Sequence, residues 1–120
     1  MRLGLDLIEI GRVRRLLERH GDGFRNRCFT AAEQEYCEGK TNPAQHYAGR
    51  FAAKEAVGKA LGTGVHFTWK EIEISGRPKP GVHLSGRTAL AAERLGAAQI
   101  DVSMTHSREL AAAVAVVVPT

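Results

Sequence analysis

The sequence predicts a single small α+β domain in which a largely antiparallel sheet packs against a long central helix. Three observations support this prediction. The 120 residues suit one domain with one modest core. Apolar residues switch along the chain between the spacing of strands and the spacing of helices. The resulting order is a strand, three helices, two strands, a helix and two strands, which is typical of α+β proteins. No repeat or linker interrupts this order, so residues 1–120 are expected to form one domain.

Local signals place the individual elements. Alternating leucines mark the first strand, and apolar residues with helical spacing mark the helix that follows. Thr30 and Glu33 form a capping box that opens the second helix. Asn42 and Pro43 open the third helix, and Gly62 stops it. The expected elements are strands over 2–8, 71–75, 81–84, 100–105 and 110–118, and helices over 10–20, 31–37, 43–61 and 88–95.

Two elements are expected to be buried on more than one side. The strand over 110–118 is apolar on both faces, which favours a central, doubly covered position in the sheet. The helix over 43–61 carries apolar or small residues nearly all round. This helix should therefore contact its own core and leave a further side for contact with another subunit.

Composition excludes several classes of protein. Hydrophobic residues make up 43% and charged residues 25% of the chain, an ordinary globular profile. No apolar run approaches the roughly 18 residues of a membrane span, and the segment from Met1 to Asp6 reaches an acid at once, unlike a signal peptide. Cys28 and Cys37 lack CxxC spacing and are expected to be reduced thiols. These features predict a cytoplasmic protein.

Positive charge gathers near the start of the chain. The formal net charge is +4, and residues 9–27 hold six arginines against three acidic residues, an excess of three. Such a patch favours an acidic partner, such as nucleic acid, a membrane surface or an acidic protein. A solvated helix face is the alternative interpretation, and charge alone does not decide between the two.

Two acidic residues stand in apolar surroundings. Asp6 interrupts the leucines of the first strand, where aspartate is disfavoured. Glu55 extends the apolar stripe of the long helix. Both are candidate ligands of a hard cation such as Mg2+, which binds one or two carboxylates together with water and phosphate oxygens. Two other interpretations stay open: Asp6 as a strand-end carboxylate bonded to backbone amides, and Glu55 as the i, i+4 partner of Lys59.

Two further segments carry polar groups suited to phosphate. The turn Gly62-Thr63-Gly64 follows the long helix directly, and Lys59 lies just before it. Arg50 and Lys54 on the same helix supply donors for anionic oxygens. Taken in isolation, such a turn is more often an ordinary helix cap. Thr105-His106-Ser107 places three polar groups between two strands, where a lone histidine is usually a surface residue.

Three motifs together resemble the holo-acyl-carrier-protein synthases, a family of 4'-phosphopantetheinyl transferases. Gly4-Leu5-Asp6-Leu7-Ile8-Glu9-Ile10 is similar to the N-terminal motif of that family. The run from Arg50 to Gly64, which contains Lys54-Glu55-Ala56, is similar to its signature helix and turn. Val102-Ser103-Met104-Thr105-His106-Ser107, followed by residues 111–118, is similar to its closing hairpin. The signature helix is highly specific, and the match covers nearly the whole chain in order.

The resemblance implies a fold, a reaction and a set of ligands. The fold would be that of the 4'-phosphopantetheinyl transferases, assembled as a homotrimer with active sites between subunits. The reaction would move 4'-phosphopantetheine from coenzyme A to a serine of an acyl carrier protein, of fatty-acid or polyketide type. Asp6 and Glu55 would hold Mg2+. The implied coenzyme A contacts are Arg50, Lys59, Gly62, Thr63, Gly64, His106 and Ser107.

The resemblance also implies roles in catalysis and docking. Lys59 would steady charge on the leaving phosphate, and Glu55 is the candidate to accept the serine proton, directly or through a metal-bound water. Arg12 matches a position that engages the carrier protein. Pro78-Lys79-Pro80 departs from the Gly-Lys-Pro usual in the family, so the resemblance assigns that loop no role. The neighbours of Arg12 that match only by region are Arg15, Phe24, Arg25 and Arg27.

Two other functions fit parts of the sequence. A nucleic-acid-binding module would use the basic segment, but only 6% of the residues are aromatic and no reader motif is evident. A non-catalytic carrier-protein-binding subunit would keep the same fold, and the presence of Asp6, Glu55 and Lys59 argues against it. We therefore expect coenzyme A and an acyl carrier protein as partners, and neither nucleic acid nor a membrane.

Overall fold

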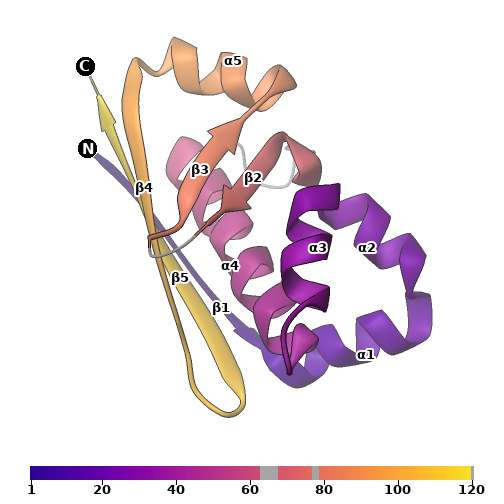
Figure 1. Cartoon of the computed structure of the whole chain (residues 1–120). Helices are drawn as coiled ribbons and strands as arrows, with labels where there is room; N and C mark the ends of the chain where they lie inside the picture. Colours follow the sequence, from indigo (N-terminus) through magenta and orange to yellow (C-terminus); the bar gives the residue numbers. More distant parts are fainter. Residues whose placement is uncertain (63–67, 77–78, 120) are drawn as a thin grey trace.

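Helix α4 lies across a three-stranded antiparallel sheet, and a two-stranded sheet and the other helices surround it (Figure 1). The structure is a computed structural model that describes residues 1–62, 68–76 and 79–119. The antiparallel α+β fold expected from the sequence is confirmed. The elements are β1 (Arg2–Glu9), α1 (Ile10–His20), α2 (Asp22–Cys28), α3 (Ala31–Glu38), α4 (Pro43–Leu61), the short 3-10 helix η2 (Trp69–Glu71), β2 (Ile72–Ser75), β3 (Gly81–Leu84), α5 (Gly86–Arg94), β4 (Ala97–His106) and β5 (Leu110–Pro119).

Strand β5 is the centre of the larger sheet. Strands β1 and β4 pair with it antiparallel on either side, so the strand order is β1-β5-β4. The central position expected for the last strand is therefore confirmed. Ala111, Ala113 and Ala115 alternate along β5 and are buried on the face that packs against α4. Small side chains on this face allow the helix to approach the sheet closely.

The other face of this sheet is apolar and exposed. Leu3, Leu5 and Leu7 alternate along β1 and are 65%, 66% and 62% exposed. Leu5 lies opposite Val114 of β5, which is 38% exposed, and Val118 further along is 40% exposed. Within one chain, the double cover expected for β5 is thus met on one face, the face toward α4.

Helix α4 is buried on several sides, as its composition predicts. Tyr47, Ala52 and Ala56 have no exposed surface. Gly62 ends the helix in the left-handed conformation, with a φ of 74°. Asn42 precedes the helix without forming a side-chain cap, and a proline follows it at the first position.

In the described part of the chain, no helix has the length and apolar character needed to cross a membrane.

The region between α1 and α3 differs from the prediction. Asp22–Cys28 forms α2, a seven-residue helix that the apolar pattern does not indicate. Gly21 separates α1 from α2 with a φ of 48°, a conformation that glycine adopts readily. A helix this short has too few turns to show a periodic signal. The capping box that opens α3 is confirmed, because Thr30 and Glu33 each accept a hydrogen bond from the other's backbone amide.

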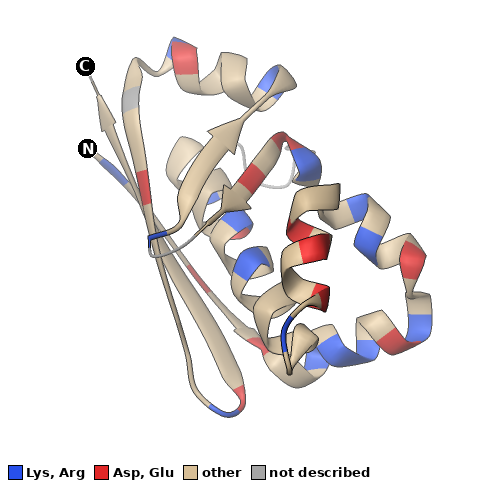
Figure 2. Cartoon of the chain, in the orientation of Figure 1, with Lys and Arg blue, Asp and Glu red and all other residues tan. Residues whose placement is uncertain are grey.

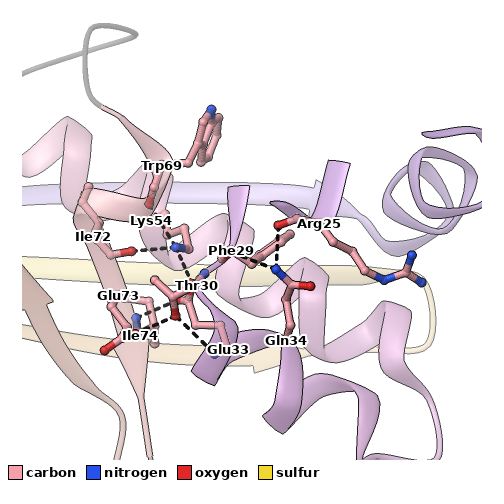
Figure 3. Close-up of polar contacts among 10 residues, drawn as sticks. All are labelled: Arg25, Phe29, Thr30, Glu33, Gln34, Lys54, Trp69, Ile72, Glu73 and Ile74. Atoms are coloured by element: carbon pink, nitrogen blue, oxygen red, sulfur yellow. Dashed lines mark hydrogen bonds and ion pairs between the residues drawn. The ribbon is translucent and has the colours of Figure 1, made fainter. Parts of the chain in front are cut away.

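A buried ion pair ties α4 to its neighbours (Figure 3). The Lys54 ammonium donates to Glu33 Oε1 at 2.6 Å, and to the carbonyl oxygens of Trp69 at 3.0 Å and Ile72 at 2.6 Å. Glu33 Oε2 accepts a hydrogen bond from the Ile74 amide at 2.8 Å. Neither charged side chain has any exposed surface. The expectation that Lys54 donates to a ligand is wrong, because its three protons join α4 to α3, η2 and β2.

Candidate active site

Asp6, Glu55 and Lys59 meet where β1 crosses α4. Asp6 shares with Gly4 the face of β1 that turns toward the helix. Glu55 and Lys59 lie one turn apart on α4, and Glu55 is close enough to Asp6 for the two charges to interact. The Lys59 ammonium donates to Asp6 Oδ1 at 3.2 Å and to the carbonyl oxygen of Leu5 at 2.8 Å. We refer to Asp6, Glu55 and Lys59 as the acidic cluster.

The charges of the acidic cluster are not balanced. Burial raises the pKa of Glu55, and the nearby charge of Asp6 raises that pKa further. The positive charge of Lys59 lowers the pKa of Glu55, but the net effect is an increase. In the described residues Lys59 forms its ion pair with Asp6, so the i, i+4 pair with Glu55 is not the arrangement found. Two carboxylates face one ammonium, which belongs to a lysine side chain that is 51% exposed. This excess of negative charge favours the binding of a cation.

The donor set fits a hard divalent cation with open coordination positions. Two carboxylates are what Mg2+ commonly takes from a protein when phosphate and water complete its shell. In the part of the chain that the structure describes, no group of three or more His, Cys, Asp or Glu side chains could hold a metal ion by itself. A cation here would be held by Asp6 and Glu55 and would need further oxygen ligands from a substrate.

A pocket of about 460 Å3 lies beside β4, at the other edge of the sheet. Its lining includes Tyr36 from α3, Arg50 from α4, Lys79, and His106 at the end of β4. The Arg50 side chain is buried, and its guanidinium carbon lies 3.8 Å from the centre of the Tyr36 ring. Among the described residues, the Nε of Arg50 has no hydrogen-bond partner. A buried cation with an unused donor favours an anionic ligand. We call this cavity the basic pocket.

Sequence reasoning finds part of the basic pocket. Arg50 and His106 line it, as the resemblance implies, and Nε2 of His106 lies 2.8 Å from the side-chain nitrogen of Gln45. Tyr36 and Lys79 are not predicted, because no local pattern links a short helix to the segment before β3. The stacking of Tyr36 on Arg50 depends entirely on how α3 packs beside α4.

Of the other residues expected to contact coenzyme A, the structure describes Ser107 and Gly62. Ser107 lies in the turn between β4 and β5, where its hydroxyl oxygen accepts a hydrogen bond from the Leu110 amide at 3.2 Å. Gly62 ends α4, one turn beyond Lys59. Thr63 and Gly64, also expected to contact coenzyme A, lie outside the described residues.

The acidic cluster and the basic pocket lie at opposite edges of one sheet. Asp6 belongs to β1, whereas residues 102–106 of β4 line the pocket. Strand β5 separates the two edge strands. Helix α4 contacts all three strands. It contributes Glu55 to the acidic cluster and Arg50 to the basic pocket. Within one chain, the two groups are therefore kept apart by the central strand.

Arginines form a basic face on α1 (Figure 2). Arg12 and Arg15 are exposed, and together with Arg19 they border a groove of about 150 Å3 beside Leu16. Arg19 is one of the six arginines of the basic segment but is not among the residues expected to contact the carrier protein, although its spacing from Arg12 and Arg15 places it on the same side of a helix. The face is suited to an acidic partner.

The three residues of α2 that are expected to bind a partner differ in their exposure and contacts. Arg25 is tied to α3, because its Nε donates to Glu38 Oε2 at 2.9 Å. Phe24 is half-buried, and its ring lies edge-on to Phe29 with centroids 5.6 Å apart. Arg27 is exposed. Arg25 and Phe24 therefore help to hold α2 in place, while Arg27 presents its charge to solvent.

Family and sequence comparisons agree with these observations. The family model described as the 4'-phosphopantetheinyl transferase superfamily matches residues 2–115. A holo-[acyl-carrier-protein] synthase of Chlamydia felis is 49% identical over 117 residues, which cover 95% of this chain and 93% of that protein. The similarity thus includes the segments that carry the acidic cluster, the basic pocket and the basic face of α1.

Solved structures are similar over nearly the full length. The holo-[acyl-carrier-protein] synthase of Neisseria meningitidis superposes with a TM-score of 0.89 at 28% identity, covering 98% of this chain and 97% of that chain. The holo-[acyl-carrier-protein] synthase of Helicobacter pylori, in complex with coenzyme A, superposes with a TM-score of 0.85 at 29% identity. That match covers 97% of this chain and 99% of the Helicobacter chain.

Proposed function

This chain belongs to the 4'-phosphopantetheinyl transferase superfamily, and we infer that it transfers 4'-phosphopantetheine from coenzyme A to a serine of an apo-acyl-carrier protein. The products are the holo-carrier protein and adenosine 3',5'-bisphosphate. The observation that carries the inference is the meeting of Asp6, Glu55 and Lys59 in a chain 49% identical to a holo-[acyl-carrier-protein] synthase. The complex of the Helicobacter pylori relative with coenzyme A supports the choice of donor substrate.

The acidic cluster is the proposed reaction centre. Phosphoryl transfer depends mainly on positioning and on neutralising negative charge, rather than on covalent catalysis. A Mg2+ ion held by Asp6 and Glu55 would supply charge neutralisation at the pyrophosphate of coenzyme A. Lys59 is placed to steady the charge on the leaving phosphate, and its bond to the Leu5 carbonyl holds the ammonium beside Asp6.

Glu55 is the proposed acceptor of the serine proton. Burial raises its pKa, and a carboxylate with a raised pKa is a stronger base once ionised. As the serine oxygen bonds to the β-phosphorus, the bond from that phosphorus to the leaving phosphate oxygen breaks and Glu55 takes the proton. A Glu55 variant that still binds Mg2+ and keeps the pH–rate profile of the parent enzyme would exclude this role.

The basic pocket is the proposed site for a phosphate of coenzyme A remote from the reaction centre. Arg50 and His106 line it, and a buried guanidinium suits a phosphate oxygen. Because the pocket and the acidic cluster lie at opposite edges of the sheet, we propose that one complete site is shared between neighbouring chains. Replacing Arg50 with Met is expected to raise the KM for coenzyme A more than the KM for the carrier protein.

A homotrimer is the proposed assembly. The exposed leucines of β1 and the valines of β5 form an apolar face of the kind that protein contacts cover. A closed ring of three chains would place the β1 edge of one chain beside the β4 edge of the next. Equilibrium sedimentation is expected to give three times the chain mass of 13.0 kDa. A fully active monomer would overturn this proposal.

The basic face of α1 is the proposed docking surface for the carrier protein. Arg12 and Arg15 are exposed there and would attract an acidic carrier during encounter. Reversing both charges, as R12E/R15E, is expected to raise the KM for the carrier about tenfold and leave the KM for coenzyme A nearly unchanged. The control is Arg94→Glu on α5, which also reverses an exposed charge. An equal loss of affinity for both substrates would contradict this docking surface.

Loading of a carrier protein tests the proposed reaction directly. The purified protein is incubated with apo-acyl-carrier protein and coenzyme A, with and without Mg2+, and the carrier is weighed by intact mass spectrometry. The expected result is a metal-dependent gain of about 340 Da, the mass of one phosphopantetheinyl group. No gain with several carriers, from folded protein that binds coenzyme A, would instead support a non-catalytic carrier-binding subunit.

The proposed cellular setting is the cytoplasm. Cys28 and Cys37 are free and buried, in keeping with a reducing compartment such as the cytoplasm. Cell fractionation checks this location. A role in fatty acid biosynthesis is tested by comparing fatty-acid and polyketide carriers in the loading assay, where the fatty-acid carrier is expected to have the higher kcat/KM.

A further inference from the structure

The spacing of the acidic cluster depends on a close contact between β1 and α4. Gly4 precedes Asp6 by two residues and lies on the same face of the strand. A Cβ atom added at Gly4 would overlap the carbonyl oxygen of Ala56 and lie 2.8 Å from the amide nitrogen of Ala60. Both are backbone atoms of α4, which no change of rotamer can move aside. Strand β1 therefore reaches its observed distance from α4 because residue 4 has no side chain.

This contact involves residues adjacent in sequence or on the same strand face to both acidic residues. Ala56, which Gly4 approaches, follows Glu55 on α4. On the same strand, the Nε of Arg2 donates to the carbonyl oxygen of Ala60 at 2.7 Å and fixes the strand along the helix. The close approach at Gly4 and the bond from Arg2 together set both the distance and the register of β1 against α4.

The opposite side of α4 is held by the buried ion pair. Lys54 lies two residues before Ala56, and residues two positions apart on a helix point about 200° apart. Its bonds to Glu33 and to the backbone of η2 and β2 hold the side of the helix that faces away from β1 (Figure 3). A larger residue at position 4 is therefore expected to displace β1, an edge strand, rather than α4. Displacement of β1 carries Asp6 away from Glu55.

We propose that Gly4 is a positioning residue, whose missing side chain sets the separation at which Asp6 and Glu55 share one divalent cation. This inference rests on the proposed function, because it takes these two carboxylates as the metal site. Mg2+ and Mn2+ need their oxygen ligands in a narrow range of positions. A displaced strand thus weakens the site even where the fold is kept.

Gly4→Ala is the direct test, with Mn2+ as the probe. Binding of Mn2+ to the purified protein is followed by the EPR signal of the free ion. The dissociation constant is expected to rise about tenfold, the size of effect seen when groups that orient metal ligands are removed. The matched control is Gly23→Ala, since a Cβ at Gly23 meets no atom within 4 Å. Affinity equal to that of the parent in folded Gly4→Ala overturns the proposal.

Asp6→Glu separates a change of spacing from a general loss of stability. The longer side chain should recover part of the Mn2+ affinity and of the carrier loading in the Gly4→Ala background. In the parent background, where the gap suits an aspartate, the same substitution should weaken Mn2+ binding. A merely structural defect at position 4 would give no recovery, and that result would overturn the proposal.

A second set of variants serves if Gly4→Ala does not fold. A fixed gap predicts that Asp6→Glu and Glu55→Asp each weaken Mn2+ binding and that the double variant regains affinity. Single variants that bind Mn2+ like the parent would overturn the proposal.

Failure of the metal site itself gives a different result. A parent protein that binds no Mn2+ would count against Asp6 and Glu55 as metal ligands, and so against that part of the proposed function. The spacing is then decided by a crystal structure of Gly4→Ala, or of Gly4→Ser if alanine does not fold. Unchanged packing of β1 on α4 overturns the claim that Gly4 sets the spacing, and a displaced strand supports that claim but not the shared cation.

Discussion

Lys54 and Lys59 lie on the same helix, just over one turn apart, in opposite environments. Lys54 has no exposed side-chain surface, and its protons bind Glu33 and two backbone carbonyls. Lys59 is 51% exposed and lies beside Asp6 and Glu55, whose combined charge it does not balance. A buried charge whose hydrogen bonds are all made inside the fold stabilises the structure only as a matched pair. A charge in an exposed, unbalanced cluster is available to a ligand.

The comparison shows that one side of α4 has a structural role and another side faces the proposed reaction centre. The side that carries Lys54 joins α3, η2 and β2 into one framework. The side that carries Glu55 and Lys59 faces β1 and the proposed reaction centre. Rigid attachment on the first side is what lets the second side hold its carboxylate in place.

The largest expected effect comes from breaking the buried pair. Lys54→Met leaves the Glu33 carboxylate buried without its cation, so the free energy of unfolding should fall by about 3–5 kcal/mol. Urea unfolding measures the change. The double variant E33Q/K54M should cost less than the sum of the two single variants, because it leaves no unpaired charge. A Lys54→Met protein as stable as the parent would show that the buried Lys54 has no structural role, contrary to the proposed contrast with Lys59.

Lys59→Met is expected to show the reverse behaviour. Its side chain is half exposed, so the free energy of unfolding should change by no more than about 0.5 kcal/mol. The kcat for carrier loading should fall about 100-fold, because a cation near the leaving phosphate is lost. Lys59→Arg, which keeps the charge, should retain more activity than Lys59→Met. Full activity in Lys59→Met would remove this lysine from the reaction.

Glu38 provides an intermediate case with a smaller effect. Its Oε2 accepts hydrogen bonds from the Tyr47 hydroxyl at 2.6 Å and from Arg25 Nε at 2.9 Å, yet its side chain is 46% exposed. The bond from Tyr47 lowers the pKa of Glu38, with Arg25 adding to the effect. A carboxyl whose pKa is lowered by folding adds stability above its ordinary pKa. That stability is lost as the pH falls through the folded-state value.

Glu38→Gln tests this pH dependence. The substitution should lower the free energy of unfolding by about 0.5 kcal/mol near neutral pH, a small value because solvent screens the exposed carboxylate. At a second, acidic pH, low enough to protonate the parent carboxylate in the folded state as well, the loss should be smaller still. Urea unfolding at both pH values measures the difference. An equal loss at both would show that charge plays no part.

Most of the fold could be predicted because its signals are local. The capping box at Thr30 and the left-handed glycine at position 62 depend on residues within one helical turn, and both are found as predicted. The apolar character of β5 predicts its central position correctly. Helix α2 is missed because seven residues after a glycine show no helical period. The second face of β5 stays exposed within one chain, and its cover by a neighbouring chain belongs to the proposed trimer.

The candidate site could be predicted in its parts. Asp6 and Glu55 are conspicuous as acids in apolar segments, and the resemblance of the motifs assigns them to Mg2+. Their meeting depends on packing, because 49 positions separate them and no spacing rule spans that distance. The stacking of Tyr36 on Arg50 is likewise a contact between two helices that the sequence pattern does not reveal.

The sequence by itself determined the order of elements apart from α2 and η2, together with the family and the residue types that carry the chemistry. These follow from caps, periodicity and motifs that act over a few residues. Only the tertiary structure decided which lysine is buried and which can reach a ligand. The resemblance assigns a role to Lys59 but leaves Lys54 as one more donor on the same helix, and Lys54 is buried because Glu33 and the Ile72 carbonyl, far away along the chain, are brought to it. The role of a charged side chain depends on which distant partners folding supplies.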